Sequence, residues 1–257
     1  MEEEHIQHFS EQAGDSWAAL RKFTAARIAL GRTGISEPLA HSLQFKLAHA
    51  YARDAVFSEI NIDELTRDIN NQFDIPVYSL QSQAGNRQEY LQRPDLGRKL
   101  SLQSVENLKK NVGNAPDIAI ILADGLSATA INQHALPVLQ LLVPNLRQLN
   151  CSLAPITLVE QGRVAISDEI GYLFKTKLAL ILIGERPGLS SPDSLGAYFT
   201  YNPQPGLTDE SRNCLSNIRP AGLTYQEAAN KLTYLLQEAL RLKLSGVLLK
   251  DTTNLLS

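Results

Sequence analysis

The clearest hydrophobic feature of the chain is the unbroken apolar run Leu178–Ile183, which Gly184 closes. The run is too short for an ordinary helix and has no polar side, which is typical of a strand buried on both faces. Asp117–Ala123 and Ala154–Glu160 show a similar pattern. We therefore predict three inner strands. Val77–Leu80 and Ala197–Tyr201 are candidates for further strands.

Helical spacing of apolar residues separates these runs. A helix over residues 38–60 is expected to present Leu39, Leu43 and Leu47 on one apolar face. The sequence also predicts helices over 101–111, over 126–150 with a break or kink near its prolines, and over 168–175. Thr224 and Glu227 form a capping box that begins a helix reaching about Lys243. A last strand is expected at Gly246–Lys250.

Strands that alternate with helices predict the α/β class, with right-handed crossovers between neighbouring strands. We expect a Rossmann-like, mostly parallel sheet with flanking helices, preceded by a smaller, mainly helical N-terminal domain. The expected divisions are a mobile acidic tail over residues 1–15, the helical domain over 16–112 and the α/β domain over 113–257.

Composition narrows the possible functions. The 257 residues carry a net charge of -3, so no basic excess points to a nucleic-acid partner. The two cysteines, Cys151 and Cys214, lack metal-binding or disulfide-framework spacing and fit a reducing cytosol. No histidine pairs with other ligands at metal spacing. The longest apolar run is far short of a membrane span, and the acidic start MEEEHIQHF does not resemble a secretory signal.

Three predicted strands end in unusual loops, Asp124–Ser127, Glu160–Val164 and Gly184–Gly188. In open α/β sheets, ligands bind in the crevice beyond the carboxyl ends of the strands. If the sheet is parallel, the three loops lie on one edge and form a pocket. A fourth loop, Arg212–Pro220, could close that pocket.

Each of these loops also has a plainer explanation. Asp124 and Gly125 could form only a turn, with Ser127 capping the next helix. Arg163 and Arg186 are either surface charges or groups that bind an anion or an amide-rich ligand. Glu185 and Arg186 could equally be a solvated pair. No histidine lies near Cys214 in sequence, so we expect either contact with a cofactor or simple packing there, and no catalytic thiol.

Several enzyme signatures are missing from the sequence. It contains no phosphate-binding loop with a lysine, no GxGxxG after a strand and no GxSxG elbow. A self-contained dehydrogenase, nucleotide hydrolase or serine hydrolase is therefore poorly supported. Three hypotheses stay open: a cofactor-binding subunit of a larger enzyme, a stand-alone nucleotide-dependent enzyme, and a scaffold whose helix over 38–60 docks a partner.

Seven ordered blocks carry a resemblance to a known family. The chain resembles the small (light) subunit of ethanolamine ammonia-lyase over about residues 16–251, in RIALGRTG (27–34), YLQRPDLGRKL (90–100), ADGLSATA (123–130), QGRVAISDEIG (161–171), LIGERPGLSSPDSL (182–195), RNCLSNIRP (212–220) and LSGVLLK (244–250).

This resemblance implies an activity that residue spacing does not show. Enzymes of that family use adenosylcobalamin to convert ethanolamine to acetaldehyde and ammonia by a radical mechanism, in which the cofactor supplies the radical. A large barrel-shaped subunit holds ethanolamine, the small subunit covers the corrin at the interface, and the assembly is a hexamer of heterodimers. We therefore expect a lyase subunit that is inactive alone. Neither nucleic acid nor membrane is expected as a partner.

The resemblance also assigns site residues. The small subunit's corrin contacts correspond to Val164, Glu185 and Cys214, in the loops singled out above, so residues 113–257 become the expected cobalamin-contacting domain. The chain lacks the DxHxxG context of a cobalt-ligating histidine, which implies base-on cobalamin. We expect no catalytic residue and no metal ligand from this chain. The expected location is cytoplasmic, and a bacterial microcompartment is left open.

Overall fold

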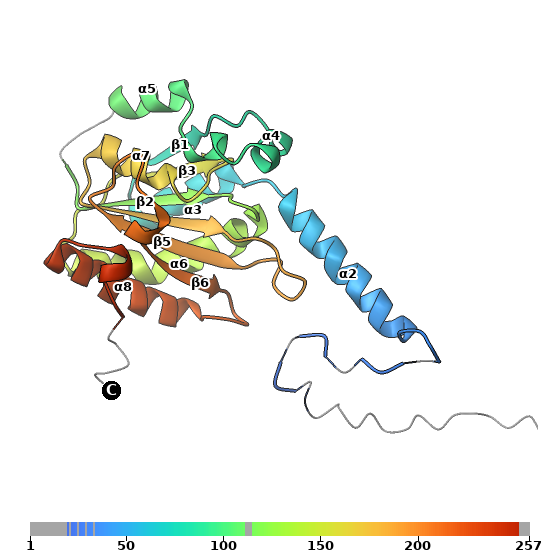
Figure 1. Cartoon of the computed structure of the whole chain (residues 1–257). Helices are drawn as coiled ribbons and strands as arrows, with labels where there is room; N and C mark the ends of the chain where they lie inside the picture. The colour runs from blue at the N-terminus through green and yellow to red at the C-terminus, as the bar shows by residue number, and fades with distance from the viewer. Residues whose placement is uncertain are drawn as a thin grey trace, which may run out of the picture. The chain divides into compact units, whose positions relative to one another are not determined.

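The computed structural model describes residues 20, 22–24, 26–28, 30–32, 34–110 and 115–251 (Figure 1). The tail expected over residues 1–15 lies outside these ranges. The chain divides into two compact units, Met1–Ala50 and Tyr51–Ser257. Helix α2, Leu39–Val56, begins in the first unit and ends in the second. Its predicted apolar residues Leu39, Leu43 and Leu47 are exposed.

The second unit contains a six-stranded sheet with the order β1-β3-β2-β4-β5-β6. The strands are β1 (Val77–Gln81), β2 (Ile118–Ala123), β3 (Ile156–Glu160), β4 (Leu178–Gly184), β5 (Leu195–Tyr201) and β6 (Arg212–Ile218). The remaining helices are α3 (Ile62–Phe73), α4 (Arg87–Gln92), α5 (Leu102–Lys110), α6 (Ala128–Gln148), α7 (Ile166–Phe174) and α8 (Tyr225–Leu242), with short 3-10 turns η1 (Leu96–Arg98), η2 (Asp209–Ser211) and η3 (Gly246–Leu248).

Strand β4 is the inner strand that its apolar run predicts. Every one of its residues is buried. It pairs in parallel with β2, which pairs in parallel with β3, and β3 in turn pairs in parallel with β1. On its other side β4 pairs antiparallel with β5, and β5 with β6. The α/β class is confirmed, and the sheet is mixed because residues 185–194 contain no helix that could return the chain for a parallel pairing.

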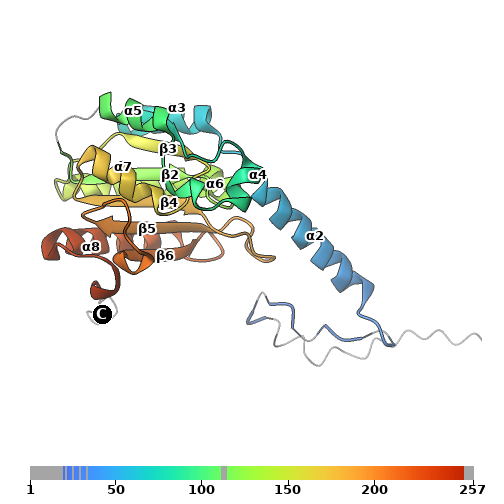
Figure 2. The same ribbon diagram turned by 45° about the horizontal axis from the view of Figure 1, so that its top comes forward.

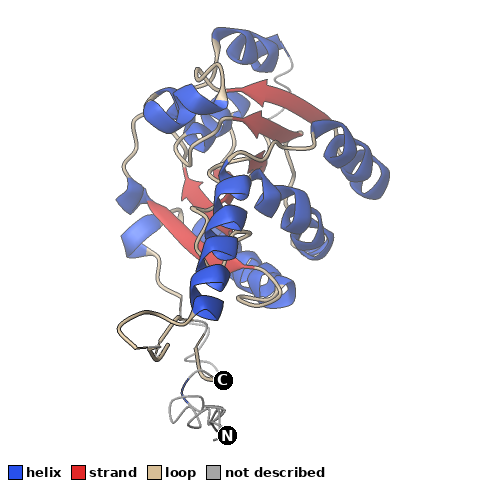
Figure 3. Ribbon diagram, turned by 90° about the vertical axis from the view of Figure 1, so that its right-hand side faces the viewer, coloured by secondary structure: helices blue, strands red, loops and turns tan. Residues whose placement is uncertain are grey.

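Helices cover both faces of the sheet (Figures 2 and 3). Helices α3, α6 and α8 pack on one face, and together with the strand residues pointing that way they form the larger core. Helices α5 and α7 pack on the other face over a smaller core. Alternate residues of β2 and β4 therefore enter different cores, which is why both strands are apolar without interruption. No helix among the described residues is long and apolar enough to cross a membrane.

The expected division at residue 112 differs from the observed one. Strand β1 lies inside the segment predicted as a helical domain, yet it pairs with β3 along its whole length. Helix α3 packs in the larger core and α5 in the smaller one. Backbone pairing and shared cores thus join residues 62–110 to the α/β body, and the division of the chain lies instead between Ala50 and Tyr51.

Three local predictions are corrected by the structure. Gly246–Leu248 form a 3-10 turn, η3, and residues 246–250 contain no strand. Arg212–Ile218, predicted as part of a loop, is strand β6. Helix α6 continues through Pro137 and Pro144, so of the expected break or kink the break does not occur. Many of its residues are buried against the sheet and α8, and this tertiary packing outweighs the cost of a proline in a helix, about 3 kcal/mol each.

Candidate functional site

The three predicted loops meet at the carboxyl edge of the parallel strands. The Asp124 carboxylate, just after β2, accepts hydrogen bonds from the backbone N–H groups of Gln161 (2.8 Å) and Gly162 (3.0 Å), just after β3. The N–H of Leu126 donates to the carbonyl of Gly184, at the end of β4, at 2.9 Å. The prediction that these loops share one edge is therefore confirmed.

Asp124 is the buried anchor of this edge. Its carboxylate lies 3.7 Å from Nη1 of Arg87, and that same nitrogen donates to the carbonyl of Gly125 at 2.7 Å. Burial raises the pKa of Asp124 from 3.8 to about 6, against the opposing effects of its backbone donors and of Arg87. Asp124 and Gly125 therefore do hold the turn after β2, as the plainer explanation expects. The expected cap by Ser127 is wrong, because its hydroxyl donates to the carbonyl of Pro192 and accepts from no helix N–H.

The raised pKa of Asp124 predicts a pH dependence of stability. Between pH 3.8 and 6 the folded chain keeps a proton that the unfolded chain has lost. The stability contributed by this group is complete below about pH 4 and is lost as the pH rises through 6, a change of about 3 kcal/mol. Asp124→Asn removes this titration. Urea unfolding from pH 4 to 7 should show the wild-type advantage over the variant shrinking as the pH rises; two parallel curves would contradict it.

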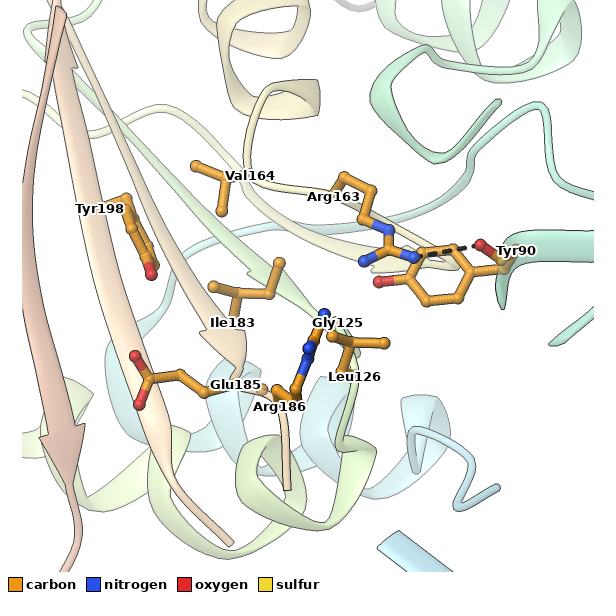
Figure 4. A pocket seen from close by; sticks show the side chains of 10 residues that line it. Tyr90, Gly125, Leu126, Arg163, Val164, Ile183, Glu185, Arg186 and Tyr198 are labelled. Atoms are coloured by element: carbon orange, nitrogen blue, oxygen red, sulfur yellow. Dashed lines mark hydrogen bonds between the residues drawn. The ribbon is translucent and has the colours of Figure 1, made fainter. Parts of the chain in front are cut away.

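A cleft of ≈ 380 Å³ opens between these loops (Figure 4). Figure 4 shows Glu185 and Tyr198 on one side and Arg163 and Tyr90 on the other, with Ile183 between them. A second cleft of ≈ 290 Å³ adjoins it, because Arg163, Val164 and Tyr198 line both. We call the two together the strand-edge ledge.

The strand-edge ledge brings the three sequence-predicted site residues together. Val164 lines both clefts, Glu185 lines the first and Cys214 lines the second. Cys214 reaches this position because β6 pairs antiparallel with β5, in a register that sets it opposite Tyr198. The three residues therefore lie on one face of the molecule.

The Glu185 carboxylate is held by three donors. It accepts hydrogen bonds from the hydroxyls of Ser194 and Ser216, both at 2.6 Å, and from the N–H of Asn217 at 3.1 Å. Gly196 leaves room for this group, since a Cβ there would lie 2.9 Å from Oε1 of Glu185. The side chain is thus fixed between β5 and the end of β6. The alternative explanation, in which Glu185 and Arg186 are a solvated pair, is therefore wrong for Glu185.

Two arginines flank the ring of Tyr90. The guanidinium carbons of Arg163 and Arg87 lie 4.1 and 4.7 Å from its centroid, within the range of cation–π attraction. The Tyr90 hydroxyl donates to the carbonyl of Gly162 at 3.1 Å, and burial raises the pKa of this phenol. Arg163 also donates from Nη2 to the carbonyl of Tyr90 at 3.2 Å, so its position in the ledge is fixed.

Cys214 and Tyr198 form the far end of the ledge. Desolvation raises the pKa of the Cys214 thiol, while a hydrogen bond with Tyr198 opposes the shift. A thiol with a raised pKa carries little thiolate at neutral pH and is a weak nucleophile. The two residues instead offer a soft and an aromatic surface.

Sequence reasoning missed Tyr90, Arg98 and Tyr198 as residues of the ledge. The sequence marks Tyr198 only as part of the strand pattern AYFTY, and Tyr90 and Arg98 precede the first predicted inner strand. The alternation of strand β5 is the one signal that could have placed Tyr198, since every second side chain reaches the same face. Among the described residues, no group of His, Cys, Asp and Glu could hold a metal ion.

Comparisons with known proteins find similar sequences that share one name. The family model described as "Ethanolamine ammonia-lyase light chain (EutC)" matches residues 14–250. The ethanolamine ammonia-lyase small subunit of Azotobacter vinelandii is 53% identical over 238 residues, which cover 91% of this chain and 88% of the relative. The same-named protein of Pseudomonas aeruginosa is 50% identical over 254 residues, covering 98% and 92%.

The fold and the ledge define an α/β protein whose candidate site is an open surface at the carboxyl edge of its sheet. The match to the family model spans most of the chain, and the relatives align over most of their own length. The chain belongs to the ethanolamine ammonia-lyase light-chain, or small-subunit, family. It is therefore a component of a lyase of ethanolamine degradation.

Proposed function

We propose that this chain caps the corrin of adenosylcobalamin, in base-on form, where it meets a large subunit that holds ethanolamine. The complex would deaminate ethanolamine to acetaldehyde and ammonia, as a hexamer of heterodimers that is inactive without the large subunit. The observation that carries the proposal is the strand-edge ledge, which gathers Val164, Glu185 and Cys214 on one open face.

The chemistry of the ledge fits a corrin. A corrin is a broad, largely apolar disc edged with amides. Val164, Tyr198 and Cys214 supply apolar contact, and the fixed carboxylate of Glu185 supplies an acceptor for an amide N–H.

The size of the ledge fits a capping role. Each cleft lies near the lower end of the range that encloses a drug-sized ligand, about 300–1,000 Å³, and a corrinoid is several times larger than such a ligand. The chain can therefore cover one side of the cofactor only, and a partner must hold the rest.

In this proposal the residues of this chain bind the corrin and orient it. Adenosylcobalamin, when bound, supplies the radical chemistry. Val164 and Tyr198 displace water from the covered face of the ring. Glu185 sets the ring's rotation, because its three donors leave its carboxylate little freedom to turn. No side chain of the ledge is assigned a proton transfer or a bond to cobalt.

The test of the proposed function is reconstitution. The chain is co-expressed with the large subunit of the family enzyme, and ammonia release from ethanolamine is measured with and without adenosylcobalamin. We expect the two chains to co-purify, and activity only when both chains and the cofactor are present. Nucleotide binding by the isolated chain together with no effect of adenosylcobalamin on the assembled pair would overturn the proposal in favour of a nucleotide-dependent enzyme.

Glu185→Ala is expected to weaken cobalamin binding more than it destabilises the fold. Loss of one charge-assisted acceptor predicts a Kd for hydroxocobalamin raised about 5–10-fold in the assembled enzyme. Ser216 and Asn217 are exposed and can bond to water instead, and only Ser194 is buried, so the melting temperature should change little. Glu238→Ala, which breaks an ion pair with Arg241 on α8, is the matched control. Unchanged cofactor affinity in Glu185→Ala would remove Glu185 from the site.

A further inference from the structure

We propose that Arg98 and Arg163 form an anion subsite in the second cleft, which receives the phosphodiester of the cobalamin nucleotide loop. This inference rests on the proposed function, because it assigns one part of the same ligand to one part of the ledge. It also decides between the two explanations of Arg163 that the sequence leaves open, a surface charge or a group that binds an anion.

Arg163 carries a positive charge that no carboxylate balances. Among the described residues it makes no ion pair within 4.0 Å, and its contacts are the ring and the carbonyl of Tyr90. Its Nε is buried and has no hydrogen-bond partner. A buried donor without a partner is unfavourable, so the acceptors of the chain itself do not fully satisfy this guanidinium.

Arg98 places a second positive charge in the same cleft. It lines the second cleft with Arg163 and, among the described residues, forms no ion pair. The backbone joins the two segments that carry these arginines, because the N–H of Arg163 donates to the carbonyl of Gly97, the residue before Arg98, at 2.7 Å. A Cβ on Gly97 would lie 2.8 Å from Cγ of Arg163, so this close approach requires glycine.

The other charged groups of the second cleft are already paired. Arg212 binds Asp168 and Asp209, and Asp209 is the acidic residue that lines the cleft. Arg212 shares its one charge between two carboxylates, so the described groups in and directly beneath the cleft keep one positive charge in excess, and Arg98 and Arg163 form no ion pair of their own among them. Guanidinium groups bind phosphate oxygens with two parallel hydrogen bonds, which suits a phosphodiester better than a neutral amide.

The start of α7 does not provide this subsite by itself. The N–H groups of Ile166, Ser167 and Asp168 already donate to the carbonyls of Arg163, Val164 and Ala165. The anion must therefore be held by side chains. Val164 and Cys214, the proposed corrin contacts, line the same cleft, so a phosphodiester tethered to the ring edge falls beside them.

The test compares three corrinoids on the assembled enzyme, by absorbance titration without turnover. Cobalamin carries the phosphodiester, cobinamide phosphate keeps a phosphate without the ribose and base, and cobinamide lacks all of these. Arg98→Gln and Arg163→Gln should each raise the Kd of cobalamin and of cobinamide phosphate about tenfold and leave that of cobinamide within twofold. Arg163→Lys, which keeps the charge, should recover part of the loss.

Two controls separate the possible failures. Arg241→Gln, on α8, should change none of the three affinities, and inorganic phosphate should compete with cobalamin and not with cobinamide. If the glutamine variants weaken all three corrinoids equally, or none, the subsite is wrong while corrin capping stands. If the wild-type assembly binds no corrinoid at all, the proposed function itself fails.

Discussion

Asp168→Ala is expected to lower the free energy of unfolding by about 3–5 kcal/mol. Asp168, on α7, and Arg212, at the start of β6, are almost completely buried and form an ion pair. Removing the carboxylate leaves the guanidinium without its buried partner. The remaining acidic partner, Asp209, has a side chain that is 97% exposed, and an exposed partner contributes little.

The ionisation of Asp168 supports this expectation at neutral pH. Burial raises its pKa to about 6, and the charge of Arg212 opposes the shift, so the carboxylate is ionised at pH 7. The ion pair joins α7, which begins just after Val164, to β6, which contains Cys214. Its loss should therefore loosen the second cleft as well as the fold.

The measurement is urea unfolding of the full chain at pH 7. Asp95→Ala breaks the exposed pair with Arg93 and serves as the matched control, with an expected loss below about 1 kcal/mol. A double variant, Asp168→Leu with Arg212→Met, should recover much of the stability, because apolar residues of similar size often replace a buried pair without loss. Equal, small losses in Asp168→Ala and Asp95→Ala would contradict the prediction.

Gly184→Ala is expected to cost about 3 kcal/mol or more of folding free energy. Gly184 ends β4 against the turn after β2, and a Cβ there would lie 2.0 Å from the carbonyl oxygen of Ser127 and 2.6 Å from that of Asp124. Both obstacles are backbone atoms, which cannot turn aside as a side chain would. The strand end must then move away from the turn, and the hydrogen bond from Leu126 to Gly184 breaks.

Gly85→Ala is the control for this variant, since its Cβ would meet only the flexible end of Glu89, at 3.4 Å. Soluble yield and the urea midpoint are measured for both. The control should stay close to the wild type. A Gly184→Ala chain within about 1 kcal/mol of the wild type would show that the contact between the two strand ends is not required.

Much of the architecture could be predicted from the hydrophobic pattern. The run Leu178–Ile183 is buried on both faces as expected, and the capping box of Thr224 and Glu227 begins α8. Strand β6 could not be found in this way. Its buried residues are Arg212, Leu215 and Ile218, with polar side chains between them, so it lacks the alternation of a half-buried strand.

The surroundings of Glu185 and Cys214 could not be predicted from the residues near them in the sequence. The sequence marks Glu185 as a carboxylate at the end of an apolar strand, but its three donors come from residues 194, 216 and 217. Cys214 lies beside Tyr198 only because of the register between β5 and β6. Such register depends on cross-strand pairing, which nearby residues do not encode.

The sequence alone determined the α/β class, the inner strands and the shared edge of their three loops, because burial on two faces demands continuous apolar runs and parallel strands end together. Ordered motifs also indicated the family before any coordinates. Only the tertiary structure decided that β5 and β6 run antiparallel, and that Arg98 and Arg163 line one cleft and form no ion pair among the described residues. The charge of a cleft depends on all the residues that line it, and these residues are distant in the sequence until the chain folds.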